Sequence, residues 1–405
     1  MSTSLSLYPH AEFGVADEGP AARLFAHTLE QAVRRGASDI HVEPGESSWR
    51  IRLRVDGVLH EMPEPPGHLR DSFVTRVKVL ARLDIAERRI PQDGRLRLAV
   101  APGRIEDYRV STLPTVHGEK LALRRLEALP TDLSLVALGF DAWQRPRIEK
   151  AIRAPHGLIL VTGPTGSGKT LSLYAFLQLL NDRSRNVCTV EDPVEIELGG
   201  VNQVSVREKT GLTFAAALRA LLRQDPDVIM VGEIRDAETA DVALKAAQTG
   251  HLVLATLHTN DAPGAIGRLL DLGVAPYTLA EALKLVTAQR LARRLCGHCR
   301  APAPVPRAAL VAAGLTREPS AAWAPYGPRG CAACHGTGYR GRIGLHQIMS
   351  ASHALCDLVS AGANTQAIAR QAKADGTGSL RQAALARVVE GVTSLVEAVA
   401  VTDTA

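Results

Sequence analysis

Residues 163–170, GPTGSGKT, match the phosphate-binding pattern G-x-x-x-x-G-K-[ST]. The segment follows an apolar stretch typical of a strand and opens a pattern typical of a helix. Glycines let backbone N–H groups point inward around phosphates, and the start of the helix adds positive potential. Lys169 would reach the β- and γ-phosphates, and the Thr170 hydroxyl would hold Mg²⁺. The expected nucleotide-binding residues are Gly163, Pro164, Thr165, Gly166, Ser167, Gly168, Lys169 and Thr170.

Acidic side chains follow two of the next apolar stretches. VEDPVE places Glu191, Asp192 and Glu195 after one stretch, and DVIMVGE places Glu233 after another. Carboxylates at the C-terminal edge of a parallel sheet face the ligand crevice. Glu233 therefore suits a residue that orients the attacking water or a Mg²⁺-bound water. An Asp usually precedes this acid, but Gly232 stands there, so Glu233 acts alone or with the acidic cluster.

His258 ends a further apolar stretch, in LATLHTND, with no cysteine or second histidine beside it. A lone histidine is more often a core or surface group than a functional one. Near a phosphate-binding loop, however, its ring could donate toward a γ-phosphate or hold the groups around the catalytic water. We therefore predict that His258 senses the nucleotide.

Four of the six cysteines form two C-x-x-C pairs. Four thiolates so arranged suit tetrahedral Zn²⁺, and a closed site with four protein ligands is structural rather than catalytic. The intervening loop has little apolar core, so the metal would supply its folding energy. Two nearby histidines, His298 and His335, are alternative ligands. The expected ligands are Cys296, Cys299, Cys331 and Cys334.

The composition of the 405 residues is that of an ordinary globular protein with a net charge of +5. Aromatic residues make up only 4%, which argues against a base-stacking nucleic-acid platform. No apolar run is long enough to span a bilayer, and the first residues lack the pattern of a secretory signal. These features predict a cytoplasmic protein with reduced cysteines.

The patterning of apolar residues changes along the chain. Residues 21–130 contain two helical patterns, arginine-rich alternating strands and a hairpin turn at Asp56-Gly57, which indicate a small α+β domain on an antiparallel sheet. Residues 131–295 begin with a linker and then alternate continuous apolar strands with helices, as in a doubly wound α/β domain with a parallel sheet. We expect disorder in residues 1–20, a zinc subdomain in 296–340 and a helical end in 341–405.

Three arginines of the first domain could serve the same chemistry: Arg95, Arg109 and Arg124. Most exposed arginines only keep a surface hydrated. A phosphate-loop ATPase, however, often needs an arginine that neutralises charge in the transition state. That arginine comes from the same chain or from a neighbouring subunit.

With these motifs in their order along the chain, the sequence resembles the secretion ATPases of type II secretion systems and the assembly ATPases of type IV pili. The resemblance extends from residue 37 to about residue 400 and includes a small PAS-like domain before a RecA-like core. The segments that carry it include ASDIHVEP, ERRIPQDGRLRL, RVSTLPTVHGEK, GPTGSGKT, VEDPVE, DPDVIMVGEIRD, TGHLVLATLHTNDA, RLCGHC and CAACHGTGYRGRIG.

The resemblance implies a hexameric ring in which the small domain of one subunit packs on the RecA-like domain of the next. ATP would then bind at that junction, and Arg95, Arg109 and Arg124 would close over its phosphates. The resemblance makes Glu195 the candidate general base and Glu233 the acid that organises Mg²⁺ and water. Which of the two is the base stays open. His258 falls in the family's histidine box.

The same resemblance implies partners and a location. The partners would be inner-membrane platform proteins and acidic phospholipid, with no nucleic acid, and the protein would be peripheral at the inner membrane. Family members commonly carry a further docking domain, whereas only about twenty residues precede the small domain here. Two alternatives are a DNA-uptake or pilus-retraction motor and a RecA-like nucleic-acid translocase with a zinc module. The cysteine pairs favour assembly over retraction.

Overall fold

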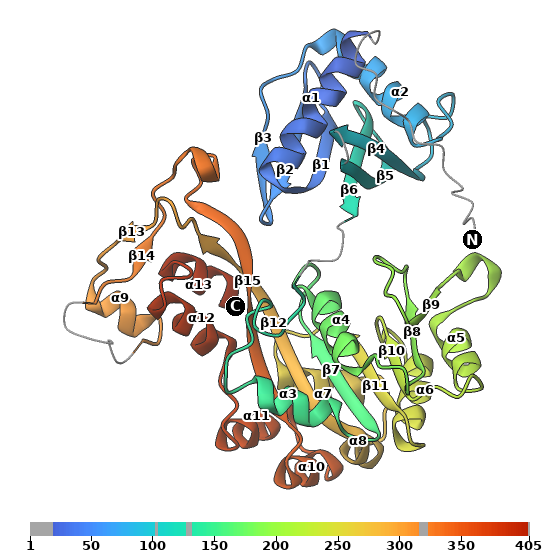
Figure 1. Ribbon diagram of the computed structural model, residues 1–405, viewed down its shortest axis with the longest axis vertical. Coiled ribbons are helices and arrows are strands. Elements are labelled where there is room, and N and C mark those ends of the chain that lie inside the picture. Colours follow the sequence, from blue (N-terminus) through green and yellow to red (C-terminus); the bar gives the residue numbers. More distant parts are fainter. Residues whose placement is uncertain (1–18, 102–103, 127–131, 316–322, 404–405) are drawn as a thin grey trace. The chain divides into compact units, whose positions relative to one another are not determined.

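The computed structural model describes residues 19–101, 104–126, 132–315 and 323–403 (Figure 1). The chain divides into two compact units, Met1–Ala128 and Leu129–Ala405. Within the described ranges, no helix combines the length and apolar character needed to cross a membrane.

The N-terminal unit is a six-stranded antiparallel sheet covered by two helices, with the strand order β3-β2-β1-β6-β5-β4. The alternating pattern predicted this arrangement, because Trp49, Ile51 and Leu53 point into the core while the arginines between them do not. The elements are α1 (Pro20–Arg35), β1 (Ala37–Pro44), β2 (Trp49–Val55), β3 (Val58–Glu61), α2 (Arg70–Leu80), β4 (Gln92–Ala101), β5 (Arg104–Thr115) and β6 (Gly118–Leu126).

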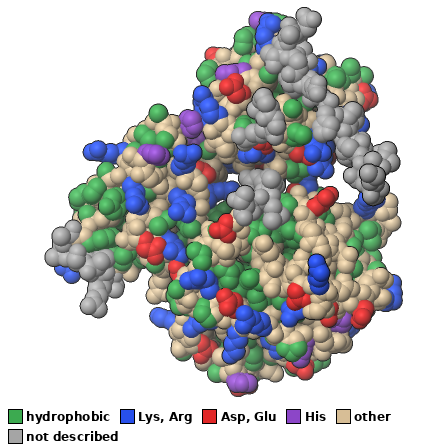
Figure 2. All heavy atoms as spheres, in the orientation of Figure 1, with side chains coloured by type: hydrophobic (Ala, Val, Ile, Leu, Met, Phe, Trp, Pro, Cys, Tyr) green, Lys and Arg blue, Asp and Glu red, His purple; other side chains and the backbone are tan. Residues whose placement is uncertain are grey.

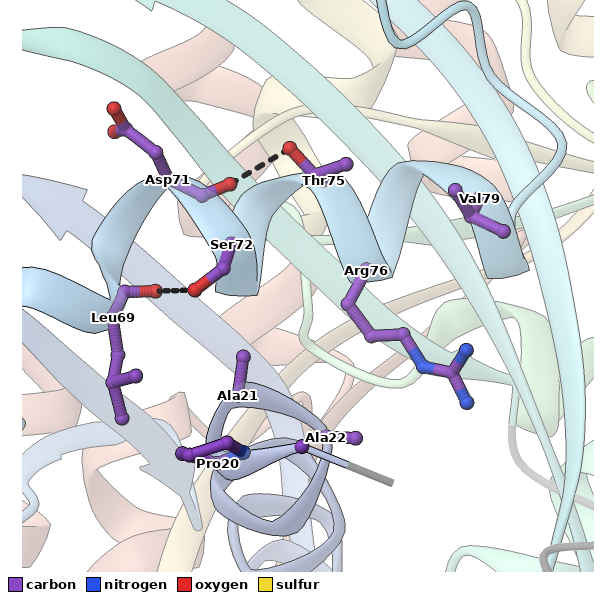
Figure 3. A pocket seen from close by; sticks show the side chains of 10 residues that line it. Pro20, Ala21, Ala22, Leu69, Asp71, Ser72, Thr75, Arg76 and Val79 are labelled. Atoms are coloured by element: carbon purple, nitrogen blue, oxygen red, sulfur yellow. Dashed lines mark hydrogen bonds between the residues drawn. The ribbon is translucent and has the colours of Figure 1, made fainter. Parts of the chain in front are cut away.

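A groove of about 670 Å³ lies between the start of α1 and one side of α2 (Figure 3). Its walls are mostly small and apolar. The hydroxyls of Ser72 and Thr75 donate to the carbonyl oxygens of Leu69 and Asp71 in their own helix turns. Those hydroxyl hydrogens are therefore already used, and the groove holds no cluster of groups suited to catalysis.

The C-terminal unit is built on a seven-stranded sheet with the order β15-β12-β7-β11-β10-β8-β9. All neighbouring strands in this sheet run parallel except β12 and β15. The strands are β7 (Gly157–Thr162), β8 (Val187–Glu191), β9 (Asn202–Ser205), β10 (Val228–Val231), β11 (Leu252–Leu257), β12 (Leu283–Leu295) and β15 (Tyr339–Ser350). The expected α/β class with a predominantly parallel sheet is confirmed.

Helices cover both faces of this sheet, as its continuous apolar strands predicted. Helices α3 and α4 pack on one face and α5 to α8 on the other (Figure 1). These helices are α3 (Arg145–Ile152), α4 (Lys169–Leu180), α5 (Phe214–Leu221), α6 (Ala237–Gln248), α7 (Ala262–Asp271) and α8 (Pro276–Ala282). The outer elements are the short strands β13 (Ala301–Pro302) and β14 (Tyr326–Gly327) and helices α9 (Arg307–Ala312), α10 (His353–Ser360), α11 (Thr365–Ala374), α12 (Leu380–Val389) and α13 (Leu395–Thr402).

Two features differ from the expected patterns. The strands β9, β12 and β15 were not anticipated, and most of β15 (Tyr339–Ser350) lies in residues 341–405, which were expected to be helical. Part of the expected linker packs into the C-terminal unit. Its Phe140 ring stacks on the imidazole of His346 with centroids 3.6 Å apart, and Gln144 Nε2 donates to the His346 carbonyl at 2.9 Å.

Candidate nucleotide-binding and catalytic site

The phosphate-binding loop joins β7 to α4 and depends on glycine for its conformation. Gly163, Gly166 and Gly168 have φ angles of +150°, +77° and +85°. A Cβ atom on Gly163 would lie 2.5 Å from the carbonyl oxygen of Gln289, so only glycine fits there. Lys169 is the first residue of α4, and its ammonium donates to the carbonyl oxygens of Gly163 at 2.9 Å and Pro164 at 3.1 Å. The ammonium thus lies against the loop that would hold the phosphates.

Gln289 supports this loop from the neighbouring strand β12. Its amide nitrogen donates to the carbonyl oxygen of Ser167 at 2.6 Å, and its amide oxygen accepts from the hydroxyl of Ser172 at 2.7 Å. The side chain is buried, so these bonds also satisfy polar groups that would otherwise be costly to bury. Sequence reasoning missed Gln289, because its partners lie more than a hundred residues earlier in the chain.

Glu233 and His258 form a contact at the end of β10 and β11. Glu233 Oε1 lies 3.0 Å from His258 Nε2, and Glu233 Oε2 accepts from Arg235 Nε at 2.8 Å. The carboxylate is therefore held between two nitrogen donors. The structure brings together two residues that the sequence singled out separately.

The order of the strands explains this meeting. Strands β7, β11, β10 and β8 are neighbours in the sheet and run parallel, so their C-terminal ends share one edge (Figure 1). The phosphate-binding loop, His258, Glu233 and the Glu195 loop follow these four strands in that spatial order. His258 is also fixed by its neighbour Thr259, whose backbone N–H donates to Thr162 Oγ1 at 2.9 Å.

Charges at this edge perturb the pKa values of the basic groups. Burial lowers the pKa of Lys169 to about 8; the negative charge of Glu233 opposes this shift and the positive charge of Arg290 adds to it. Burial and the nearby charge of Lys169 lower the pKa of His258, against the opposing effect of Glu233. Both effects favour the neutral imidazole, in which one ring nitrogen is able to donate.

Arg235 links the two acidic loops and was not predicted. Besides Glu233, its guanidinium reaches Asp192 in the loop after β8, with Nη1 3.4 Å from Oδ2. Glu195 lies in that same loop with an exposed side chain. The sequence contains no signal for the role of Arg235 beyond its place in GEIRD, two residues after the acid.

The three predicted arginines lie in the N-terminal unit, and the sheet there places them side by side. Arg95 pairs with Arg109 across β4 and β5, and Arg109 pairs with Arg124 across β5 and β6. Carboxylates flank both ends of this row. Arg95 Nε lies 2.8 Å from Asp107 Oδ1, and Arg124 Nε lies 2.9 Å from Asp39 Oδ1. Neither the common register nor the flanking acids could be read from sequence spacing.

The four predicted cysteines converge within the C-terminal unit, with all sulfurs within 4.8 Å of one another. The Sγ atoms of Cys296 and Cys331 are 3.9 Å apart, and those of Cys299 and Cys334 are 3.8 Å apart. A tetrahedral zinc site with Zn–S bonds of about 2.3 Å requires sulfurs about 3.8 Å apart. Two backbone N–H groups also point at Cys334 Sγ at 3.1 Å, a contact that suits a thiolate. The geometry therefore fits zinc with four cysteine ligands.

The phosphate-binding loop on a parallel sheet with helices on both faces defines a P-loop nucleotide-binding protein. The family model described as Type II/IV secretion system protein matches residues 15–400. The chain is 47% identical over 385 residues to the type IV pilus assembly ATPase PilB of Myxococcus xanthus, covering 95% of this chain and 68% of that protein. It is 48% identical over 386 residues to type II secretion system protein E of Pseudomonas aeruginosa, covering 95% and 76%.

Solved structures show the same fold. The pilus retraction motor PilT with bound ADP is similar with a TM-score of 0.61 and 25% identity, covering 92% of this chain and 95% of that one. The Legionella pneumophila ATPase DotB is similar in fold with a TM-score of 0.68 and 21% identity, over 95% and 96%. The chain belongs to the type II/IV secretion system protein family and is an ATPase of that family.

Proposed function

We propose that this ATPase uses ATP hydrolysis to assemble a type IV pilus or the pseudopilus of type II secretion. The observation that carries the proposal is the convergence of Lys169, Glu233 and His258 on one edge of the sheet, in a chain 47–48% identical to pilus-assembly and type II secretion proteins. A phosphate-binding loop alone would support nucleotide binding but no hydrolysis.

The chemistry follows from the positions of the side chains. On ATP binding, Lys169 exchanges the carbonyl oxygens of Gly163 and Pro164 for phosphate oxygens. Thr170 would help to hold Mg²⁺, which would neutralise phosphate charge when bound. Glu233 orients the attacking water and would help to organise Mg²⁺, and Glu195 in the neighbouring loop takes a proton from that water as general base. The single N–H of neutral His258 exchanges the Glu233 carboxylate for a γ-phosphate oxygen, so the presence of the γ-phosphate changes the contact of His258 with Glu233.

Subunits complete the site for one another in a hexameric ring. The row of Arg95, Arg109 and Arg124 in the N-terminal unit supplies positive charge to the phosphates bound by the adjacent subunit. Cycles of closing and opening around the ring convert hydrolysis into movement of a membrane partner. The ring works on the cytoplasmic face of the inner membrane, against platform proteins and acidic phospholipid.

Zinc holds together the segment that carries the cysteine pairs. The sulfur positions of Cys296, Cys299, Cys331 and Cys334 support four thiolate ligands and leave none for water. A closed site of this kind stabilises structure and supplies no catalytic chemistry.

Two observations favour assembly over the alternatives. The chain is 47–48% identical to assembly and secretion proteins but 25% identical to the retraction motor PilT. On the face shown in Figure 2, Lys and Arg side chains are dispersed among Asp and Glu, unlike the continuous basic stripe typical of nucleic-acid translocases.

The test is ATP turnover of the purified protein together with its mass in solution. We expect hydrolysis that depends on Lys169, a hexamer in the presence of nucleotide, and stimulation by vesicles containing acidic phospholipid. Stimulation by single- or double-stranded DNA instead of vesicles would contradict the assembly function and support a nucleic-acid translocase.

A further inference from the structure

A buried carboxylate at the end of β8 lies outside the chemistry described above. Glu191 is only 4% exposed. Its Oε2 accepts from the hydroxyl of Tyr174 at 2.5 Å, and its Oε1 accepts from Thr189 Oγ1 at 2.6 Å and Gln203 Nε2 at 3.1 Å. Burying a carboxylate is costly unless hydrogen bonds replace those of water, and three donors do so here. The donors come from α4, β8 and β9, so Glu191 joins three elements.

The same Gln203 side chain also holds the loop that carries Glu195. Its Nε2 donates to the carbonyl oxygen of Ile196 at 3.0 Å, and its Oε1 accepts from the backbone N–H of Leu198 at 2.6 Å. On the other side of Glu195, the backbone N–H of Val194 donates to Ser205 Oγ at 3.1 Å. Side chains of β9 therefore fix peptide groups on both sides of Glu195.

Tyr174 connects this arrangement to the nucleotide-binding helix. It lies on α4, the helix that begins at Lys169, and its side chain is fully buried. Burial and the carboxylate of Glu191 raise the pKa of Tyr174, so the hydroxyl stays protonated and donates a hydrogen bond to Glu191. A hydrogen bond from the backbone N–H of Ile196 lowers the pKa of the same hydroxyl. This contact places the Glu195 loop beside Tyr174 as well.

We propose that Tyr174, Glu191 and Gln203 form a positioning network that fixes the Glu195 loop relative to α4 and so acts on hydrolysis through Glu195. The three residues touch neither nucleotide nor water in this account, and they are positioning residues. The inference rests on the proposed role of Glu195. It adds a fixed connection between α4, the helix that follows the phosphate-binding loop, and the loop that carries Glu195.

The first test is Tyr174→Phe, which removes one hydroxyl and keeps the ring. We expect kcat to fall about tenfold while the dissociation constant for ATP changes less than about twofold, because the base is misplaced but the phosphate-binding loop is intact. Gln203→Met should have the same effect, since methionine has a similar volume and lacks the amide. The matched control is Tyr277→Phe on α8, whose side chain is exposed, and it should leave kcat unchanged.

The second test separates positioning from general structural support. If Tyr174 acts through Glu195, Tyr174→Phe should reduce kcat little further in a Glu195→Gln background, because effects of residues in one unit are not additive. An equal loss of kcat in both backgrounds would overturn the inference. So would a Tyr174→Phe variant that keeps the kcat of the wild type.

Hydrogen exchange tests the network without any catalysis. The backbone N–H of Leu198 should exchange at least about tenfold faster in Gln203→Met, while the amides of β11 keep their protection. Unchanged exchange at Leu198 in Gln203→Met would overturn the network even if kcat fell as expected. The two proposals can also be told apart. If Leu198 exchanges faster in Gln203→Met than in the wild type, but the wild type shows no ATP turnover, the proposed function is refuted and the network stands.

Discussion

Glu233 is held between His258 and Arg235, with His258 Nε2 3.0 Å from one carboxylate oxygen and Arg235 Nε 2.8 Å from the other. The two donors come from different loops of the same sheet edge. A carboxylate held on both sides has a defined orientation, which is what the positioning of a water molecule or of Mg²⁺ requires. The nearby ammonium of Lys169 connects this group to the phosphate-binding loop.

Glu233→Gln should separate binding from hydrolysis. The amide keeps the size of the side chain but loses the negative charge that orients water and Mg²⁺. We expect ATP binding close to that of the wild type and turnover at least about 10²-fold slower. Single-turnover kinetics and ATP titration measure the two quantities. Glu238→Gln, on the exposed surface of α6, is the control, and near-normal turnover of Glu233→Gln would refute its assignment.

ATP binding should take up protons near pH 8.5. Burial lowers the pKa of Lys169 to about 8 in the free protein, so this side chain is largely neutral above that pH. Phosphates favour the charged ammonium and raise its pKa, so binding adds a proton and affinity falls as pH rises above about 8. At pH 7 Lys169 is already protonated and uptake should be small. Calorimetry in buffers of different ionisation enthalpy measures this uptake, and equal proton release at both pH values would contradict the prediction.

Metal analysis should find one zinc per chain. Removing zinc leaves four mutually close thiols in a segment with little core, and the lost binding free energy is on the order of 10 kcal/mol. We expect Cys331→Ser to lower both zinc content and melting temperature, whereas Cys356→Ser on α10 should leave zinc content unchanged. A metal-free preparation with unchanged fold and melting temperature would disprove the structural role of zinc.

Arg109→Ala should be rescued by mixing. If the arginine acts on the site of a neighbouring subunit, a ring that mixes Arg109→Ala with Lys169→Ala chains contains junctions with an intact arginine and an intact loop. We expect each variant to be inactive alone and the mixture to regain activity. The control mixes Arg109→Ala with chains carrying both substitutions, which cannot form an intact junction. Absence of rescue in the first mixture would count against a shared site.

Much of the C-terminal fold could be predicted because the composition of its central strands is typical of buried parallel strands. The residues of β7, β8, β10 and β11 are all buried, and their sequences are nearly continuous apolar runs. Strand β12 was not predicted because Gln289 and several arginines interrupt its apolar pattern. The buried amide of Gln289 is explained only by Ser167 and Ser172, which are distant in sequence. Propensity and periodicity are local and carry no information about such a pairing.

The same distinction applies to the site. The phosphate-binding loop, Glu233, His258 and the four cysteines could be found because each has a local signature or ends a recognisable strand. The ion pair of Arg235 with Asp192 could not, since it depends on the neighbouring positions of β8 and β10 in the sheet. The row of Arg95, Arg109 and Arg124 likewise depends on strand register.

ATP hydrolysis at this site is best tested by measuring ATP binding and phosphate release for the zinc-loaded wild type and for Lys169→Ala. We expect that the wild type binds ATP in the presence of Mg²⁺ and releases phosphate, and that Lys169→Ala does neither while keeping its fold. The opposite result, a folded, zinc-loaded wild type that takes up no adenine nucleotide in calorimetry, would contradict this expectation.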